Sequence, residues 1–320
     1  MAGSSVASSP GGGTSGTSGT SGTSGTSGTS GTPAPGAGGA AAGYRPSATL
    51  PFGAEFRRQA SRRRTQLALG FMVLLPLIIL VAFQFDAGDD DGGGRGEFSS
   101  LADLATSGGL NFTLFSILVS ASFLLVVVVA LFCGDTVASE ASWGSLRYLL
   151  AVPVPRARLL AVKLVVALAY SGLALLLLAG TALLAGTLRY GWKPLSSQVS
   201  AELAPADGLL RLLGVLGYLA VVLLVVAGLA FLLSVTTDAA LGAVGGAVLL
   251  WILSSILDQI TALGGLRNLL PTHYSSAWLG LLSTPMQTDD VVKGAFSAVV
   301  YATLFWGLAF WRFTRKDVTS

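Results

Sequence analysis

This 320-residue chain has few charged residues and few of the side chains that most often serve in catalysis or metal binding. Charged residues make up 11% of it, whereas a soluble domain carries about 25%. The chain therefore lacks the polar surface of a soluble globular protein. Its single histidine excludes an HExxH zinc site. Its single cysteine, Cys133, cannot form an internal disulfide and is interpreted as a small packing residue.

A phosphate-binding loop is also missing. None of the four lysines follows a glycine, so the sequence has no GxxxxGK motif. The GxGD pair of intramembrane aspartyl proteases is absent as well. We therefore expect no catalytic residue, cofactor site or metal site in this chain. If ATP is used, another polypeptide must bind it.

Long apolar runs are what the sequence has in abundance. Hydrophobic residues make up 52% of the chain, and its mean hydropathy is +0.71. Six runs have roughly the length, about 20 residues, that a helix needs to cross a membrane. They predict an all-α integral membrane protein with six transmembrane helices. The runs cover residues 67–85, 110–133, 164–188, 212–235, 239–257 and 295–311.

The basic residues are unevenly divided between the two sides of the predicted membrane. When the connecting segments are assigned alternately, the side of the N-terminus holds 13 of the 19 Lys and Arg residues, and the other side holds 6. The acidic residues divide 5 against 11. Because basic flanks stay in the cytoplasm, both termini are predicted to be cytoplasmic. The positive charge lies at membrane edges, so its distribution gives no reason to expect nucleic-acid binding.

Residues 1–50 are rich in glycine, serine and threonine, with six consecutive Thr-Ser-Gly triplets. Such a segment has too little apolar surface to bury, so we predict a disordered cytoplasmic tail. The tail either has no function or serves as a tether or regulatory arm. Residues 51–66 follow as a predicted basic amphipathic helix at the inner leaflet. Phe56 lies on its apolar face, and Arg57 and Arg58 lie beside it. This helix either only sets the orientation of the chain in the membrane or also presents a surface to a cytoplasmic partner. Residues 67–320 form the predicted membrane domain.

Two further segments carry local signals. Residues 86–109 are acidic and rich in glycine, and we expect a flexible, solvated external loop without the spacing of a calcium site. Gly242 and Gly246 form a GxxxG pair that would let two helix backbones approach closely, either within the bundle or between subunits. Acidic residues are nearly missing from the runs themselves, which argues against an ion-coupled secondary transporter.

The most specific stretch is the predicted cytoplasmic segment between the second and third runs. Glu140, Trp143 and Arg147 recur at near-helical spacing, and Pro153 then breaks the helix. Arg156 follows at the start of the next predicted helix. Exposed aromatic and arginine side chains are typical of a protein contact surface. We therefore predict a helical elbow that projects into the cytoplasm.

This stretch resembles the permease subunit of type-two ATP-binding-cassette transporters, which are mostly bacterial exporters. The shared order is E-x-x-x-G-[ST]-L-R-x-L-L-x-x-P-V-x-R-x-x-L-L-x-x-K. The basic entry FRRQASRRR and the C-terminal WRFTRKDVTS also resemble that family. The residues that carry the pattern are Glu140, Gly144, Ser145, Leu146, Arg147, Leu149, Leu150, Pro153, Val154, Arg156, Leu159, Leu160 and Lys163.

The resemblance implies two permease copies, as a homo- or heterodimer, paired with two separate ATPase subunits that bind ATP and Mg²⁺. It implies a multi-pass exporter subunit in the bacterial plasma membrane, in contact with membrane lipid. The apolar walls of the predicted spans, with their few hydroxyl groups, suit a lipophilic or amphipathic cargo. The alternative is a membrane anchor or scaffold without transport activity. The elbow would be the coupling helix seated in the ATPase, formed by Glu140, Trp143, Gly144, Leu146, Arg147, Pro153 and Arg156.

The resemblance also suggests a structure for the predicted external segment 258–290. Its apolar stretches are too short to cross a membrane, so we expect paired interfacial or re-entrant helices that cap the pathway. His273 lies in this segment and is expected to hydrogen-bond within the cap rather than to bind a ligand.

Overall fold

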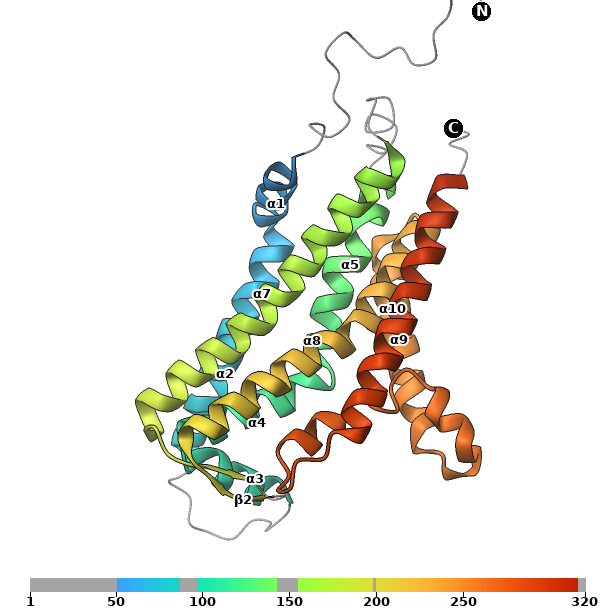
Figure 1. The fold of residues 1–320 in the computed structure, drawn as a ribbon. Coiled ribbons are helices and arrows are strands. Elements are labelled where there is room, and N and C mark those ends of the chain that lie inside the picture. The colour runs from blue at the N-terminus through green and yellow to red at the C-terminus, as the bar shows by residue number, and fades with distance from the viewer. Residues whose placement is uncertain (1–50, 87–96, 143–154, 198–199, 316–320) are drawn as a thin grey trace, which may run out of the picture. The chain divides into compact units, whose positions relative to one another are not determined.

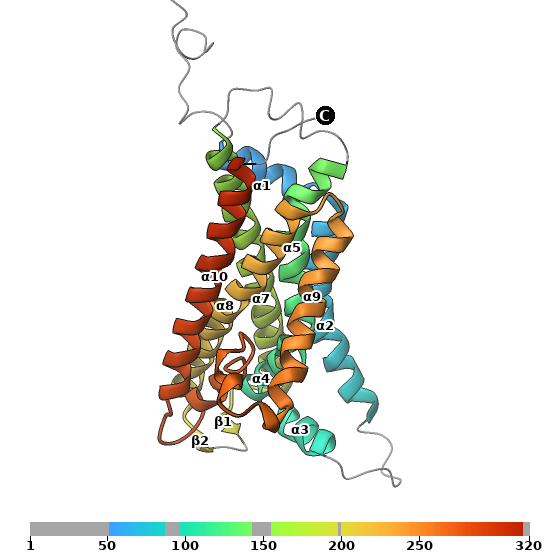
Figure 2. The same cartoon turned by 90° about the vertical axis from the view of Figure 1, so that its right-hand side faces the viewer.

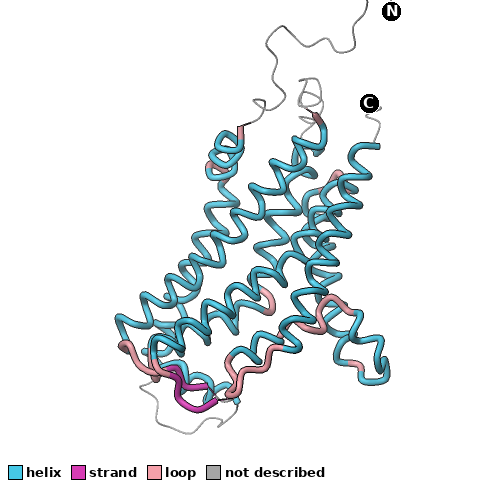
Figure 3. Tube along the Cα trace, viewed as in Figure 1, coloured by secondary structure: helices cyan, strands magenta, loops and turns pink. Residues whose placement is uncertain are grey.

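The computed structural model describes residues 51–86, 97–142, 155–197 and 200–315, all within one compact unit, 45–320. The predicted tail 1–50 lies outside the described residues. Figures 1 and 3 show a bundle of long helices with a small hairpin of strands. The helices are α1 (Phe52–Ala60), α2 (Arg63–Asp86), α3 (Glu97–Thr106), α4 (Gly109–Ala121), α5 (Leu124–Ser142), α7 (Arg156–Tyr190), α8 (Pro205–Thr236), α9 (Ala240–Gln259) and α10 (Asp289–Arg315). Two 3-10 helices, η2 (Thr261–Leu269) and η3 (Ala277–Leu281), and the antiparallel strands β1 (Leu195–Ser197) and β2 (Ser200–Leu203) complete the elements.

The six predicted apolar runs coincide with helices. Within the described residues, five helices are long and apolar enough to cross a membrane: α2, α7, α8, α9 and α10. The candidate for a sixth span is a bent pair, α4 and α5, whose axes differ by 57°. The hydroxyls of Ser116 and Ser120 donate to the carbonyls of Phe112 and Ser116, a bond that often bends helices. The described chain thus has the architecture of a multi-pass helical membrane protein.

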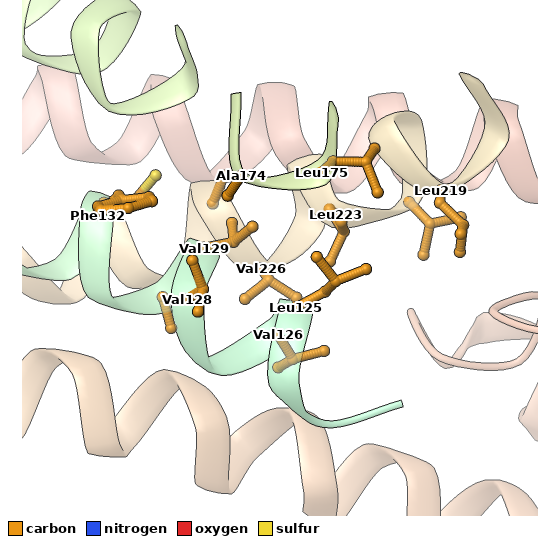
Figure 4. Packing of buried hydrophobic residues seen from close by; sticks show 14 of the residues in the cluster. Leu125, Val126, Val128, Val129, Phe132, Ala174, Leu175, Leu219, Leu223 and Val226 are labelled. Atoms are coloured by element: carbon orange, nitrogen blue, oxygen red, sulfur yellow. The ribbon is translucent and has the colours of Figure 1, made fainter. Parts of the chain in front are cut away.

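Helix α8 lies centrally and packs against α5, α9 and α10, whereas α7 packs against α2, α4 and α5. Figure 4 shows the apolar contact where α5, α7 and α8 meet. The outward faces of α2, α9 and α10 are apolar too, as expected of helices that face lipid. Buried side chains at the contact include Val128, Val129 and Phe132 of α5, Ala174 and Leu175 of α7, and Leu219, Leu223 and Val226 of α8.

Of the predicted pair Gly242 and Gly246, only Gly246 lies at a close helix approach, and Gly134 lies at another. A Cβ added to Gly134 of α5 would lie 2.9 Å from Val244 of α9, so only glycine lets these helices touch. Gly242, by contrast, is exposed and meets nothing beyond its own helix within 4 Å. A Cβ added to Gly246 would lie 3.2 Å from the Leu233 side chain of α8. Packing within the chain therefore involves Gly246 but not Gly242.

The bundle has two distinct ends, visible in Figures 1 and 2. Helix α1 and the C-terminal end of α10 lie at one end, called here the α1 end. Helix α3 and the strands lie at the other, the hairpin end. Two local predictions need correction. The first helix ends at Ala60 rather than at residue 66, and the predicted loop 86–109 contains α3. The hairpin is a small addition to a mostly helical chain, which agrees with the predicted all-α class.

Candidate functional site

Helix α1 docks on the bundle through its polar side. Its buried side chains are Glu55 and Gln59, whereas Phe52 is 45% exposed. Phe56 is half-buried and stacks on Tyr170 of α7, with ring centroids 4.6 Å apart. The Tyr170 hydroxyl also donates to the Phe56 carbonyl at 2.8 Å. The predicted apolar face is therefore only partly turned to lipid, because α1 is held against α7.

Buried charges lie beneath α1. The Lys163 Nζ of α7 is 2.6 Å from Glu140 Oε1 of α5 and 3.2 Å from Glu55 Oε1. Arg58 Nη1 lies 3.0 Å from Glu140 Oε1 and 3.5 Å from Glu55 Oε2. We call these four residues the Lys163 cluster. It joins three helices that lie far apart in the sequence.

The cluster is stable only because its charges are paired. The Lys163 side chain is 3% exposed and that of Glu140 2%, and an unpaired ion at such a depth would cost several kcal/mol. Burial alone would raise the pKa of Glu55, but the positive charges of Lys163, Arg58 and Arg62 outweigh it and hold that pKa below its ordinary value. Glu55 is therefore ionised at neutral pH, as an ion pair requires.

A second group of charges ties the start of α2 to α5. Asp135 of α5 accepts from Arg62 Nη1 at 3.2 Å and from Arg64 Nη1 at 2.5 Å. Two of the arginines that were predicted to face lipid headgroups therefore form ion pairs within the protein. Arg57 and Arg63 remain exposed.

The predicted coupling residues divide into three groups. Glu140 is buried in the Lys163 cluster rather than displayed at the surface. Arg156 is half-buried at the first residue of α7. Trp143, Gly144, Leu146, Arg147 and Pro153 fall in 143–154, outside the described residues.

Sequence reasoning missed the ion pairs because it treated Asp135, Glu140 and Lys163 as parts of one connecting segment. In the structure, Asp135 and Glu140 belong to α5, and Lys163 belongs to α7. One signal was available: Glu140 and Lys163 carry opposite charges on either side of the predicted elbow. Another was Glu55, the one acidic residue before Asp86.

The ion pair between Glu140 and Lys163 brings the C-terminal part of α5 into contact with the first turns of α7. These two helices lie on either side of residues 143–154 in the sequence. The ion pair between Lys163 and Glu55 joins α1 to the same point.

The hairpin end is held differently. His273 Nδ1 lies 2.6 Å from Asp258 Oδ1, so the prediction that His273 hydrogen-bonds within this segment is confirmed. The expected short helices are present as η2 and η3. Arg211 Nη1 of α8 donates to the carbonyls of Leu281 and Ser283 at 3.2 and 2.7 Å. Side chains of the spans therefore hold the backbone of this segment in place.

A small apolar cavity of about 110 Å³ lies between α5, α7 and α8. Ser171, whose hydroxyl donates to the Ala167 carbonyl, supplies its polar side chain. Such a cavity suits an apolar group. Its lining consists of Val129, Leu168, Ser171, Gly172, Leu175, Ala220, Leu223, Leu224 and Ala227.

Comparison with known proteins shows a match to one family model. No curated protein matches the chain. The family model of DUF2705, described as a protein of unknown function, matches residues 77–319. The match includes Glu140 and Lys163 and begins after Glu55. Because it covers most of the sequence, this chain belongs to the DUF2705 family.

Proposed function

We propose that this chain is the membrane-spanning permease subunit of an ABC transporter. In this proposal a separate ATPase subunit binds ATP and Mg²⁺ and drives export of a lipophilic or amphipathic compound across the plasma membrane, with both termini of the permease in the cytoplasm. A second permease copy completes the transporter. The number of candidate spans, up to six, fits such a subunit.

The observation that carries the proposal is the contact between Glu140 and Lys163. These residues begin and end the sequence pattern of the elbow, and their side chains lie 2.6 Å apart. An ATPase that pushes on residues 141–162 would therefore move α5 and α7 as a pair. Glu140 is a positioning residue in this account, since its carboxylate is buried within the cluster, and Arg147 is the residue expected to touch the ATPase.

The interior between the spans supports the choice of cargo. The cavity between α5, α7 and α8 is lined almost wholly by apolar side chains. Transfer of an apolar group into such a space is favourable by about 25 cal/mol per Å² of buried surface. At about 110 Å³ the cavity can hold a small apolar group of a lipophilic or amphipathic compound rather than the whole molecule.

The first experiment asks whether ATP use belongs to another subunit. The purified chain alone should neither bind nor hydrolyse ATP, and export from vesicles should require an added ATPase subunit. Removing the catalytic glutamate of that ATPase should stop export. ATP hydrolysis by this chain alone would overturn the proposal.

The second experiment tests the elbow itself. Arg147→Ala should leave expression and membrane insertion intact but weaken co-purification of the ATPase, because truncation of a docking anchor costs ~2 kcal/mol or more. Arg312→Ala is the matched control, since Arg312 is an exposed arginine at the α1 end on α10. If both variants retain the ATPase equally, the contact lies elsewhere. If the chain binds a cytoplasmic partner without any export, it is a scaffold instead.

A further inference from the structure

A charged cavity of about 670 Å³ lies at the α1 end, where α1, the first turn of α2 and α5 meet. Four guanidinium groups and two carboxylates line it, so its net charge is positive. An anionic group is therefore the ligand that its charge favours. The lining residues are Arg58, Arg62, Arg63, Arg64, Asp135, Ser139 and Glu140.

The four arginines differ in what their guanidinium groups already contact. Arg58 pairs with Glu55 and Glu140, and Arg62 and Arg64 pair with Asp135. Arg63 is exposed and makes no ion pair with any other described residue. Its guanidinium can supply up to five N–H donors to a ligand that enters the cavity.

An exposed apolar stripe begins directly after Arg63 on the same helix. Leu67, Phe71 and Leu74 follow it at spacings of four, eight and eleven residues, which place all four on one helical face. Leu67 is 74% exposed, Phe71 43% and Leu74 48%. The stripe runs into a wholly apolar groove lined by Leu74, Leu77, Ile78, Val81 and Ala82. Arg63 thus stands at the boundary between polar and apolar surface.

We propose that this cavity binds the phosphate headgroup of an anionic phospholipid whose acyl chains lie along the stripe on α2. Arg63 supplies the donors to the phosphate, while the other arginines, held by their carboxylates, give the cavity its positive charge. Arginine suits this role because its planar guanidinium pairs with phosphate in a bidentate manner. The acyl chains distinguish this ligand from an acidic protein segment, which would leave the stripe uncovered. The site is independent of the proposed transport activity.

The experiment is native mass spectrometry of the full chain, freed of lipid in detergent and then titrated with phosphatidylglycerol or phosphatidylcholine. The wild-type chain should retain phosphatidylglycerol in preference to phosphatidylcholine. Arg63→Gln should lower the apparent affinity for phosphatidylglycerol about tenfold, the effect of losing a charge-assisted hydrogen bond. Arg63→Lys should keep part of that affinity, because it keeps the charge.

Arg57→Gln is the matched control. It removes the same charge from an exposed arginine of α1 that does not line the cavity, and it should leave retention unchanged. Equal losses in Arg57→Gln and Arg63→Gln would mean unspecific attraction and would overturn the proposal. Equal retention of the two lipids would do the same. Complete displacement of phosphatidylglycerol by inorganic phosphate would also overturn it, because the site would then be one for free phosphate.

Discussion

The two ends of the helix bundle are held together by different interactions. Six ion pairs at the α1 end join residues of α1, α5 and α7 and the start of α2. At the hairpin end, Arg211, Tyr218 and Tyr301 donate to backbone carbonyls of the segment that contains η2 and η3. Buried ion pairs hold one end, whereas the other end combines side-chain-to-backbone hydrogen bonds with the partly exposed pairs that Asp258 forms with Arg267 and His273.

This difference predicts at which end a change of charge lowers the free energy of unfolding most. Removing one member of a buried ion pair leaves its partner charged and desolvated, which costs far more than the pair contributes. Removing a donor to a backbone carbonyl loses only the net stabilisation from that hydrogen bond and leaves one acceptor desolvated. The α1 end should therefore be the more sensitive end.

Lys163→Met should have the largest effect. It removes the buried cation that Glu55 and Glu140 share and leaves them only Arg58, whose side chain is 45% exposed. We expect a loss of about 3–5 kcal/mol in the free energy of unfolding. Thermal unfolding of the purified protein in detergent measures it. The control is Lys293→Met, which removes an exposed lysine paired with Asp290 within one helix, and no measurable change is expected there. Equal stability of the two variants would contradict the difference between the ends.

Arg211→Met tests the hairpin end and should cost less, about 2 kcal/mol, because it removes charge-assisted hydrogen bonds to two carbonyls. Arg189→Met is its control, since Arg189 is exposed at the end of α7. The same unfolding experiment ranks them. A loss as large as that of Lys163→Met would show that the two ends are equally sensitive.

The variant Gly134→Ala tests whether helix packing, rather than charge, makes the α1 end more sensitive than the hairpin end. The added methyl would lie 2.9 Å from the Val244 side chain and 3.2 Å from its backbone nitrogen, so we expect a loss of about 1–2 kcal/mol from overpacking. Gly245→Ala is the control, because nothing lies within 4 Å of that position. It should be neutral or gain up to ~1 kcal/mol from helix propensity. A stabilised Gly134→Ala protein would show that α5 and α9 can separate freely.

The smallest effect is the pH dependence carried by Glu55. Its folded-state pKa lies below the ordinary value of 4.5, so its contribution to stability is complete above about pH 4.5 and is lost as the pH falls through the folded pKa. The difference in unfolding temperature between wild type and Glu55→Gln should shrink over that acidic range. If the difference in unfolding temperature grows as the pH falls, the folded-state pKa of Glu55 is raised rather than lowered, and the prediction is wrong.

Much of the fold was predictable from the sequence, because a membrane imposes long apolar runs that are easy to recognise. All six runs coincide with helices or, in one case, with a bent pair. The bend between α4 and α5 was missed because the run 110–133 contains no charged residue or proline. Its serine hydroxyls, which donate to backbone carbonyls, do not lower the mean hydropathy enough to divide the run.

The candidate site was less predictable. The pairs Arg62–Asp135 and Lys163–Glu55 join residues 73 and 108 positions apart, and nothing local in the sequence indicates such partners. Counting charges by membrane side placed these residues at one end correctly but treated them as solvated. Their burial follows from how α1 docks on α5 and α7, which is a matter of tertiary packing.

The most direct test of the account compares two carboxylates at the α1 end. In vesicles that contain the chain and its ATPase, export per ATP hydrolysed is measured for Glu140→Gln and for Asp135→Asn. Both changes neutralise a buried carboxylate, but only Glu140 pairs with Lys163 across the proposed elbow. We predict that Glu140→Gln keeps ATP hydrolysis and loses export, whereas Asp135→Asn keeps both. Undiminished export in Glu140→Gln, or an equal loss in both variants, would contradict the proposed coupling.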